Sequence, residues 1–197
     1  MRLLYSALSP FARKVRVFAH ESGLTGAITL EIANPYSEES ARAFNPLNKV
    51  PTLITSDGEA IYDSSVICDY LEAVSGAGLI PSGGAKRHKA LTLQALAGGM
   101  GDAALAIVRE RLRPEAEHRA DLFERQAKSL VAALDLLEAQ GLPTDRFAIG
   151  EIAVAVQLAY LDVRKVLDWR AGRPALAAWF ETVSRRDSMT VTSVQLA

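Results

Sequence analysis

Two short segments of the sequence combine residue types that could hold a small polar ligand. Val50-Pro51 stands at the entrance to a short apolar run, where a proline is tolerated because it removes no hydrogen bond from a strand interior. An X-Pro bond is also the economical site for a cis peptide, which would turn the N–H and C=O of Val50 toward a ligand. Asp63-Ser64 precedes a helical pattern, so an acid, a hydroxyl and unpaired backbone N–H groups would meet at a helix start. Together they predict a cradle for a peptide-like ligand whose α-amino acid end binds Asp63 and Ser64.

A third segment, Ser9-Pro10, could stabilise an anion. Pro10 suits the first position of a helix, because the N–H that it lacks would have no partner there, and this makes Ser9 the N-cap residue. The helix dipole and the free N–H groups of the first turn favour negative charge at that point. The Ser9 hydroxyl could therefore donate a hydrogen bond to a bound anion, or it could only cap its own helix. The residue types alone leave both interpretations open.

The elements that must position these residues alternate in type over residues 1–76, which we predict to form one domain. The predicted elements are a strand at 3–5, a helix from Pro10 to about Gly23, a strand at 28–32, a short helix at 37–44, strands at 52–55 and 60–62, and a helix at 64–74. Asp57-Gly58 is a typical turn pair and predicts that the last two strands form a hairpin. The order βαβ, α, ββα describes a small α/β domain.

A change in composition follows, and residues 77–86 are predicted to be a linker because they are rich in glycine and serine at their start. Over residues 87–197, apolar residues recur at helical spacing and no strand-like alternation persists. The predicted helices in this region are 85–113, 114–140, 152–168 and 174–186. Pro114 and Pro174 suit the first turns of two of them. The second domain is therefore predicted to be all-helical.

The composition is that of an ordinary globular protein and argues against several classes of function. The 197 residues are 49% hydrophobic and 23% charged, and the net charge of −1 gives no indication of nucleic acid or an anionic membrane as a partner. The single cysteine excludes an intrachain disulfide, and the three scattered histidines show no metal-ligand spacing. The N-terminus lacks the features of a signal peptide, and no apolar run is expected to approach membrane-spanning length. We expect a cytoplasmic protein with no metal.

Three motifs give the whole chain a resemblance to the cytosolic glutathione transferases, and they occur along the sequence in the order expected for that family. The most specific motif is NPLNKVPTL at residues 45–53, followed by DSSVI at residues 63–67. The segment SPFARKVR at residues 9–16 is similar to the first helix of bacterial serine-type members. The segment at residues 152–164 is similar to the core helix of the bacterial proteins. The resemblance implies a thioredoxin-like α/β domain followed by an all-α domain, assembled as a homodimer.

The resemblance also implies that the chain binds glutathione as a co-substrate and conjugates it to small electrophiles, as in detoxification. Ser9 would donate a hydrogen bond to the sulfur and lower the pKa of the thiol, so that the reactive thiolate forms. The backbone of Val50 would pair with the cysteinyl part, while Asp63 and Ser64 would bind the γ-glutamyl amine and carboxylate. The implied glutathione-binding residues are Lys49, Val50, Pro51, Asp63 and Ser64.

Several residues near this predicted centre have two interpretations. Lys49 could bind the glycyl carboxylate, or it could be a solvated loop lysine. Arg13, one helical turn after Ser9, could add positive potential near the sulfur, although a surface position is the simpler expectation. Cys68 lies within the predicted helix at 64–74 and is expected to pack in the core. The predicted electrophile pocket consists of Leu8, Phe11 and Met100.

Two other functions remain open from the sequence. One is a glutathione-transferase-like binding or regulatory protein with little turnover, although such proteins often lose the glutathione-binding residues that this chain retains. The other is glutathione-dependent peroxide reduction, which would use the same site. The mixed-disulfide chemistry of cysteine-type relatives is not expected, because no cysteine lies near residue 9.

One departure from the family pattern concerns folding rather than chemistry. Ala148 stands where the family usually has a serine or threonine that caps the core helix. Losing that cap should cost about 1 kcal/mol. Phe147 and Ile152 could still pack together as a hydrophobic staple across the helix start.

Overall fold

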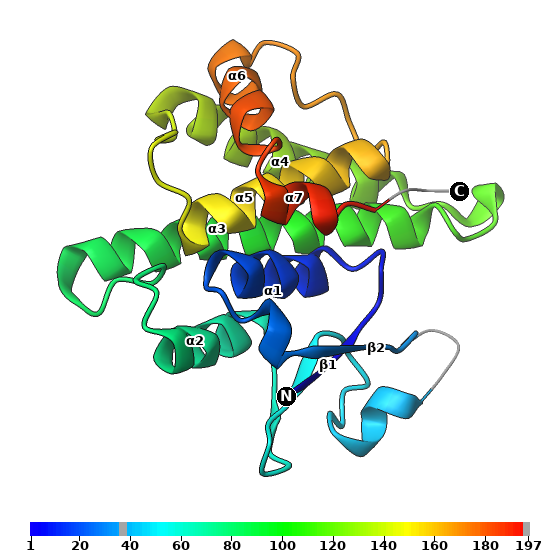
Figure 1. Cartoon of the computed structure of the whole chain (residues 1–197). Helices are drawn as coiled ribbons and strands as arrows, with labels where there is room; N and C mark the ends of the chain where they lie inside the picture. Colours follow the sequence, from blue (N-terminus) through cyan, green and yellow to red (C-terminus); the bar gives the residue numbers. More distant parts are fainter. Residues whose placement is uncertain (36–38, 195–197) are drawn as a thin grey trace.

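The computed structural model describes residues 1–35 and 39–194, which form an α/β part followed by a helical part (Figure 1). The N-terminal elements are β1 (Arg2–Tyr5), α1 (Pro10–Glu21), η1 (Thr25–Ala27), β2 (Thr29–Ile32), η2 (Ser40–Ala43), β3 (Thr52–Ile54), β4 (Ala60–Ile61) and α2 (Ser64–Ser75). The C-terminal elements are α3 (Gly84–Glu110), η3 (Glu115–Glu117), α4 (Ala120–Gln140), α5 (Ile149–Val163), α6 (Pro174–Val183) and α7 (Asp187–Val191). The predicted fold class, an α/β domain followed by an all-α domain, is confirmed.

The strands form one mixed sheet in the order β2-β1-β3-β4. β1 pairs in parallel with β2, where Leu3 lies opposite Leu30, and antiparallel with β3, where Leu3 lies opposite Leu53. The parallel pair needs a crossover connection, and α1 supplies it. Gly58, with a φ of 90°, allows the turn between β3 and β4, which confirms the hairpin predicted around Asp57-Gly58.

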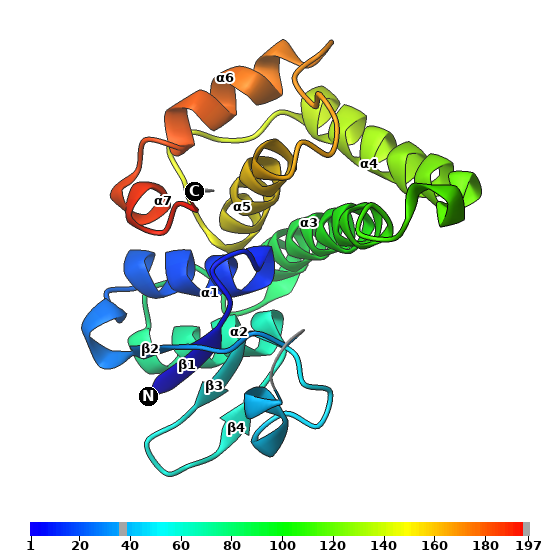
Figure 2. The same ribbon diagram turned by 90° about the vertical axis from the view of Figure 1, so that its right-hand side faces the viewer.

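Helix α1 lies between the sheet and the helical domain, as Figures 1 and 2 both show. It contacts α2 within its own domain and α5 and α7 in the other. Val15, Val17 and Phe18 are fully buried although they point in different directions around the helix, because α1 is covered on several sides. Pro10 occupies the first turn, as predicted. The helix that begins at the predicted chemical centre is thus the best-enclosed helix of the N-terminal domain.

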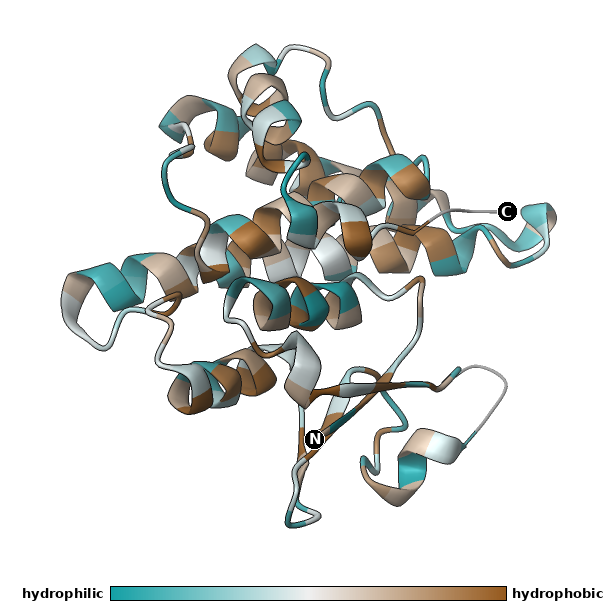
Figure 3. Cartoon of the chain, viewed as in Figure 1, coloured by the Kyte–Doolittle hydropathy of each residue, from teal (hydrophilic) through white to brown (hydrophobic). Residues whose placement is uncertain are grey.

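Helices α3 and α5 form the centre of the helical domain and pack closely at two glycines. A Cβ atom added to Gly101 would lie 2.6 Å from the side-chain amide of Gln157, and one added to Gly150 would lie 2.8 Å from Leu93. Real Cβ atoms essentially never show contacts this short, so a side chain at either position would force Gln157 or Leu93 to move. Nearly every residue of α5 is buried, and apolar residues (brown in Figure 3) run along this helix and the strands.

The length and apolar character of α3 correct one expectation. This helix has 27 residues and contains an 18-residue stretch with a mean hydropathy of 1.4, which by length and composition alone is enough to cross a membrane. In the fold, 44% of that stretch is buried, and the helix packs against α4 and α5. Its apolar composition is accounted for by its place at the centre of a helical domain.

Some helix boundaries differ from the prediction because contacts from elsewhere in the chain set them. The helix predicted at 114–140 begins only at Ala120, where the Glu110 carboxylate accepts a hydrogen bond from the Arg119 N–H at 2.9 Å. The helix predicted at 152–168 spans Ile149–Val163 and is followed by Lys165 in a left-handed conformation, φ 48°. Of the short helix predicted at 37–44, residues 37 and 38 lie outside the described part, and residues 40–43 form a 3₁₀ turn. The short helix α7 was not predicted.

The connection between the domains is held in place by one side chain. Glu72, in the last turn of α2, accepts hydrogen bonds from the backbone N–H groups of Gly78, Leu79 and Ile80 at 2.7, 3.0 and 3.2 Å. The Leu79 carbonyl in turn accepts the Ile149 N–H at 3.1 Å, at the start of α5. The residues between α2 and α3 therefore carry a defined set of contacts between the two domains.

The start of α5 shows the predicted missing cap. Ala148 has no side-chain acceptor, but its own N–H donates to the Glu151 carboxylate at 3.1 Å, so half of a capping box is present. Glu151 is buried and also accepts a hydrogen bond from Arg146. Phe147 and Ile152 are both buried on the two sides of this start, where a staple would place them.

Candidate functional site

A cleft of about 470 Å³ lies between the two domains, and two of the three segments predicted to do chemistry, at Ser9-Pro10 and at Val50, contribute to its lining. The wall from the N-terminal domain includes Leu8, Ser9, Phe11, Arg42, Lys49 and Val50. The wall from the helical domain includes Asp102, Leu105, Val108, Arg109, Leu112, Tyr160 and Arg164. One wall therefore combines polar and backbone groups, and the other is largely apolar with charges near its edge.

Ser9 is the N-cap residue of α1, as the sequence predicted. Its hydroxyl oxygen accepts a hydrogen bond from the Ala12 N–H at 3.2 Å, and Pro10 takes the first helical position. A hydroxyl that accepts one hydrogen bond still has its own proton to donate. The Ser9 side chain is partly exposed in the cleft, where the dipole of α1 favours an anion. The geometry places a hydrogen-bond donor where an anion is electrostatically stabilised.

The loop before β3 presents Lys49 and Val50 to the same cleft, and the Val50-Pro51 peptide is cis, as predicted. Asn45 fixes the loop from behind. Its buried side-chain amide donates to the Lys49 carbonyl at 3.2 Å, and the Thr52 hydroxyl donates to that carbonyl at 2.9 Å. Sequence reasoning quoted Asn45 only as part of a motif, and its buried position identifies it as the residue that shapes this corner.

Asp63 and Ser64 form the start of α2, outside the residues that line the cleft. Asp63 is exposed and caps the helix by accepting the Ser65 N–H at 2.8 Å, while Ser64 is buried. The pairing of β3 with β4 sets Leu53 opposite Ile61. Continued past the strand ends, this register brings Asp63 level with Pro51. The acid–hydroxyl pair therefore adjoins the Val50-Pro51 corner, next to the cleft.

A buried cluster lies behind the start of α2. Lys14 of α1 is only 3% exposed and donates a hydrogen bond to the Ser65 hydroxyl at 3.2 Å, and burial lowers the pKa of its ammonium group. Cys68 is fully buried in the apolar core, as predicted. Burial raises the pKa of the Cys68 thiol to about 12, although the nearby Lys14 opposes this shift. The only cysteine is therefore protonated and enclosed at neutral pH.

Of the predicted electrophile pocket, Leu8 and Phe11 line the cleft but Met100 does not. Met100 is 2% exposed and faces a separate hollow between α3 and α4. The reason is helical phase: Leu105 and Val108 lie on the side of α3 that lines the cleft, Leu112 follows just beyond the helix, and Met100 points away from that side. The prediction of Met100 was wrong, and the three aliphatic residues take its place in the apolar wall.

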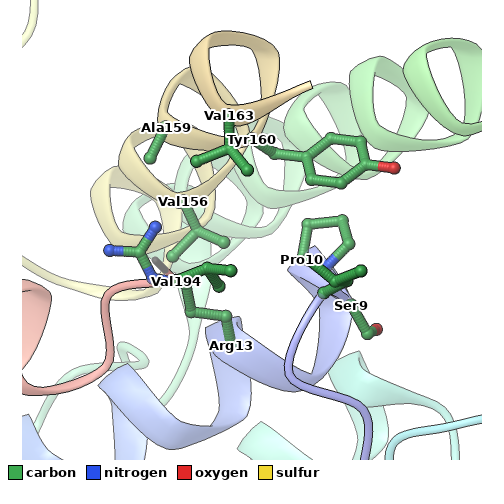
Figure 4. A pocket seen from close by; sticks show the side chains of 9 residues that line it. Ser9, Pro10, Arg13, Val156, Ala159, Tyr160, Val163 and Val194 are labelled. Carbon is green, nitrogen blue, oxygen red and sulfur yellow. The ribbon is translucent and has the colours of Figure 1, made fainter. Parts of the chain in front are cut away.

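Tyr160 is a residue of the cleft lining that the sequence did not single out. Figure 4 shows its ring reaching from α5 over Pro10, with its hydroxyl pointing to the same side of the view as the Ser9 hydroxyl. Tyr160 as a residue is 7% exposed, and it also lines the large cleft. A tyrosine in a largely apolar helix was the available signal, because a buried phenol usually needs a polar neighbour.

Arg13 occupies neither of the two places considered for it. It is 7% exposed, and its guanidinium points away from Ser9 in Figure 4. It donates hydrogen bonds to the Met189 carbonyl at 2.9 Å and to the Thr192 hydroxyl at 3.4 Å. Burial, and then the nearby Arg16, lower the pKa of this guanidinium to about 10. Arg13 thus anchors the C-terminal helix α7 to α1, and its expected surface position was wrong.

Across residues 1–35 and 39–194, no group of three or more histidine, cysteine, aspartate or glutamate side chains could hold a metal ion. The β2-β1-β3-β4 sheet, the cis-proline corner and the following helical domain together define the glutathione-transferase fold, in which a thioredoxin-like domain carries the ligand site.

Comparisons with known proteins also indicate the glutathione transferases. Residues 8–74 match the family model described as the glutathione S-transferase N-terminal domain, and residues 120–182 match that of the C-terminal domain. The chain is 36% identical to an uncharacterized GST-like protein, YibF, of Escherichia coli K12, with 98% of each chain covered. The chain therefore belongs to the glutathione S-transferase family.

Solved structures extend the likeness to the whole fold. A glutathione transferase family member from Pseudomonas fluorescens Pf-5, with bound glutathione, superposes with a TM-score of 0.93 at 37% identity over 99% of both chains. Another structure from that organism, with bound S-(propanoic acid)-glutathione, has a TM-score of 0.90 at 36% identity over 100% of both chains.

Proposed function

We propose that this protein is a glutathione transferase that conjugates glutathione to small electrophiles, with Ser9 stabilising the thiolate. The observation that carries the proposal is the Ser9 hydroxyl at the N-terminus of α1, at the meeting point of a polar wall and an apolar wall. Family membership and the glutathione-bound relatives support glutathione as the ligand of the polar wall. A hydrogen bond from Ser9 and the helix dipole would both lower the pKa of the bound thiol.

The remaining glutathione contacts follow from the arrangement around Val50. Val50 lines the cleft, and its backbone would pair with the cysteinyl unit. Asp63 and Ser64 would bind the γ-glutamyl amine and carboxylate at the start of α2, next to this corner. Lys49, on the same wall, would bind the glycyl carboxylate. Pro51 sets the shape of the corner rather than contacting the ligand through a polar group.

Conjugation would follow from proximity of the two substrates. The thiolate attacks the electrophilic carbon, a C–S bond forms, and the leaving group departs with the bonding electron pair. Leu8, just before α1, and Phe11, in its first turn, would hold the apolar part of the electrophile beside the sulfur, together with Leu105, Val108 and Leu112 on the opposite wall. The relative that holds S-(propanoic acid)-glutathione supports a cleft that accommodates a conjugate as well as glutathione.

We also propose that the protein works in the cytoplasm as a homodimer without nucleic acid or membrane partners. Tyr62, Val66 and Val74, at and beside the outer face of α2, are 37%, 51% and 50% exposed. Exposed apolar side chains gathered on one helix favour burial against another chain. Light scattering on the purified protein tests this assembly, and a monomeric mass would contradict it.

The test of the proposed function combines binding and turnover. Titration calorimetry should show glutathione binding, and 1-chloro-2,4-dinitrobenzene should be conjugated with release of chloride. A binding or regulatory protein would bind glutathione without accelerating this reaction. A peroxidase would instead oxidise glutathione with cumene hydroperoxide at a much higher kcat/KM than it shows for the aryl chloride. Either result would replace conjugation as the function.

A further inference from the structure

The wall of the cleft that faces the sulfur carries positive charge as well as apolar surface. Four cationic side chains line the cleft, namely Arg42, Lys49, Arg109 and Arg164, against one acid, Asp102, among the described lining residues. Arg42 and Lys49 belong to the wall that would hold glutathione, and Arg42 there already pairs with Glu39 at 3.0 Å. Arg109 and Arg164 belong to the opposite wall, where the electrophile would lie. Their charge is therefore not explained by glutathione.

Arg164 follows α5 directly, and a cation at that place often serves only to stabilise a helix C-terminus. Here another residue fills that role. The Arg111 guanidinium donates hydrogen bonds to the carbonyls of Arg164, Lys165 and Val166 at 3.4, 3.0 and 3.1 Å. The carbonyls that directly follow α5 thus already have a cationic partner, and the Arg164 residue, half-buried, lines the cleft.

Arg109 lies in the last turn of α3, on the face that carries the apolar wall. Leu105 lines the cleft one helical turn before it, and Leu112 lines the cleft just beyond the end of the helix. The single acid, Asp102, lies seven residues earlier, about 10 Å away along the helix axis. Within this wall, the positive charge and the apolar surface therefore meet at the C-terminal end of α3, away from Asp102.

We propose that the electrophile is an organic anion, with a carboxylate bound by Arg109 and Arg164 and an apolar body packed on Leu105, Val108 and Leu112. A guanidinium binds a carboxylate through charge-assisted hydrogen bonds of defined direction, so the anchor also orients the reactive carbon toward the sulfur beside Ser9. This proposal rests on the proposed conjugating function and names its substrate class. In the reaction, the thiol proton passes to solvent, the C–S bond forms, and the leaving group departs with its electron pair.

The test uses two aryl chlorides of nearly the same shape, 4-chloro-3-nitrobenzoate and 4-chloro-3-nitrobenzamide. For each probe, kcat/KM is divided by the rate constant of the uncatalysed reaction with glutathione, which removes the difference in intrinsic reactivity. The wild type should favour the benzoate over the benzamide about tenfold or more. Arg109→Gln and Arg164→Gln should each lower this ratio by about tenfold, because each removes one charged partner of the carboxylate.

Arg113→Gln is the matched control. Arg113 lies just beyond α3, is outside the cleft lining and pairs with Glu117 at 3.0 Å, so its removal changes the net charge without touching the anchor. The control should keep the wild-type ratio. Equal normalised efficiency for both probes in the wild type would overturn the anionic substrate class while leaving conjugation intact. An equal loss on both probes in the two arginine variants, or the same loss of ratio in the control, would also overturn it. If the protein conjugates none of the three compounds, namely the two probes and 1-chloro-2,4-dinitrobenzene, the proposed function itself is refuted.

Discussion

Replacing Ser9 by alanine should affect catalysis far more than stability, because the hydroxyl has two separable roles. As a helix cap it accepts the Ala12 N–H at 3.2 Å, toward the long end of normal hydrogen bonds. Its loss should therefore cost about 0.5–1 kcal/mol of folding free energy. The buried core around α1 does not involve the hydroxyl, so the variant should fold.

The catalytic effect of Ser9→Ala follows from a hydrogen bond that is stronger to a thiolate than to a thiol. A hydrogen bond to a charged group contributes about 1.5–3 kcal/mol. Since about 1.4 kcal/mol corresponds to one pKa unit, the pKa of bound glutathione should rise by about one to two units. Conjugation at neutral pH should then fall about tenfold to a hundredfold, while the affinity for glutathione changes little.

The assay is the ultraviolet absorbance of the thiolate in the glutathione complex, followed against pH. Ser9→Thr is the matched control, because threonine keeps both the hydroxyl and the capping acceptor. Ser9→Gly removes the hydroxyl while largely keeping the stability of the helix start, since glycine is a tolerable N-cap residue. It should match Ser9→Ala in thiol pKa but be closer to the wild type in stability. If the thiol of bound glutathione has the same pKa in Ser9→Ala as in the wild type, and the two proteins conjugate equally fast, Ser9 is only a helix cap.

Three further predictions address other parts of the structure. Asp63→Asn should weaken glutathione binding about tenfold or more in titration calorimetry without lowering the melting temperature, because asparagine still caps α2 but lacks the charge for the ligand amine; unchanged affinity would contradict the assignment. Gly150→Ala should cost about 1–3 kcal/mol in urea unfolding because of its contact with α3, whereas Gly98→Ala, with open space around it, should stabilise by about 0.5–1 kcal/mol; equal effects would refute the close packing. Hydrogen bonds from Arg186 and Ser188 outweigh burial and lower the pKa of Glu21, so the folded value lies below the unfolded one. The stability that Glu21 contributes is present above about pH 4.5 and is lost as the pH falls through its pKa in the folded protein. The difference in unfolding free energy between the wild type and Glu21→Gln should therefore shrink below about pH 4. A difference that does not depend on pH would contradict this ion pair.

Local signals predicted those parts of the fold that depend on a few neighbouring residues. Pro10 marked the first turn of α1, Asp57-Gly58 marked the hairpin, and Pro51 marked the cis bond at the cleft. Each of these depends on backbone conformations that the residue types restrict strongly. The corner of the candidate site was therefore predictable before its surroundings were known.

The remaining features depend on contacts between distant parts of the chain. The periodicity of α3 showed that the helix has an apolar face, but not which residues would face the N-terminal domain, so Met100 was chosen instead of Leu105. The burial of Arg13 depends on Met189, which is 176 residues away in the chain. The late start of α4 depends on a side-chain cap from Glu110, nine residues before Arg119. No pattern within one element carries this information.

The attachment of α7 to α1 also bears on how the protein is made. Arg13 and Glu21, both near the N-terminus, have as partners residues 186–192 at the other end of the chain. During synthesis, α1 therefore lacks part of its surroundings until residues 186–192 have left the ribosome. A fragment that stops before α7 would leave the Arg13 guanidinium without these partners. The thioredoxin-like half is thus not a self-sufficient module that recombination could move alone into another protein.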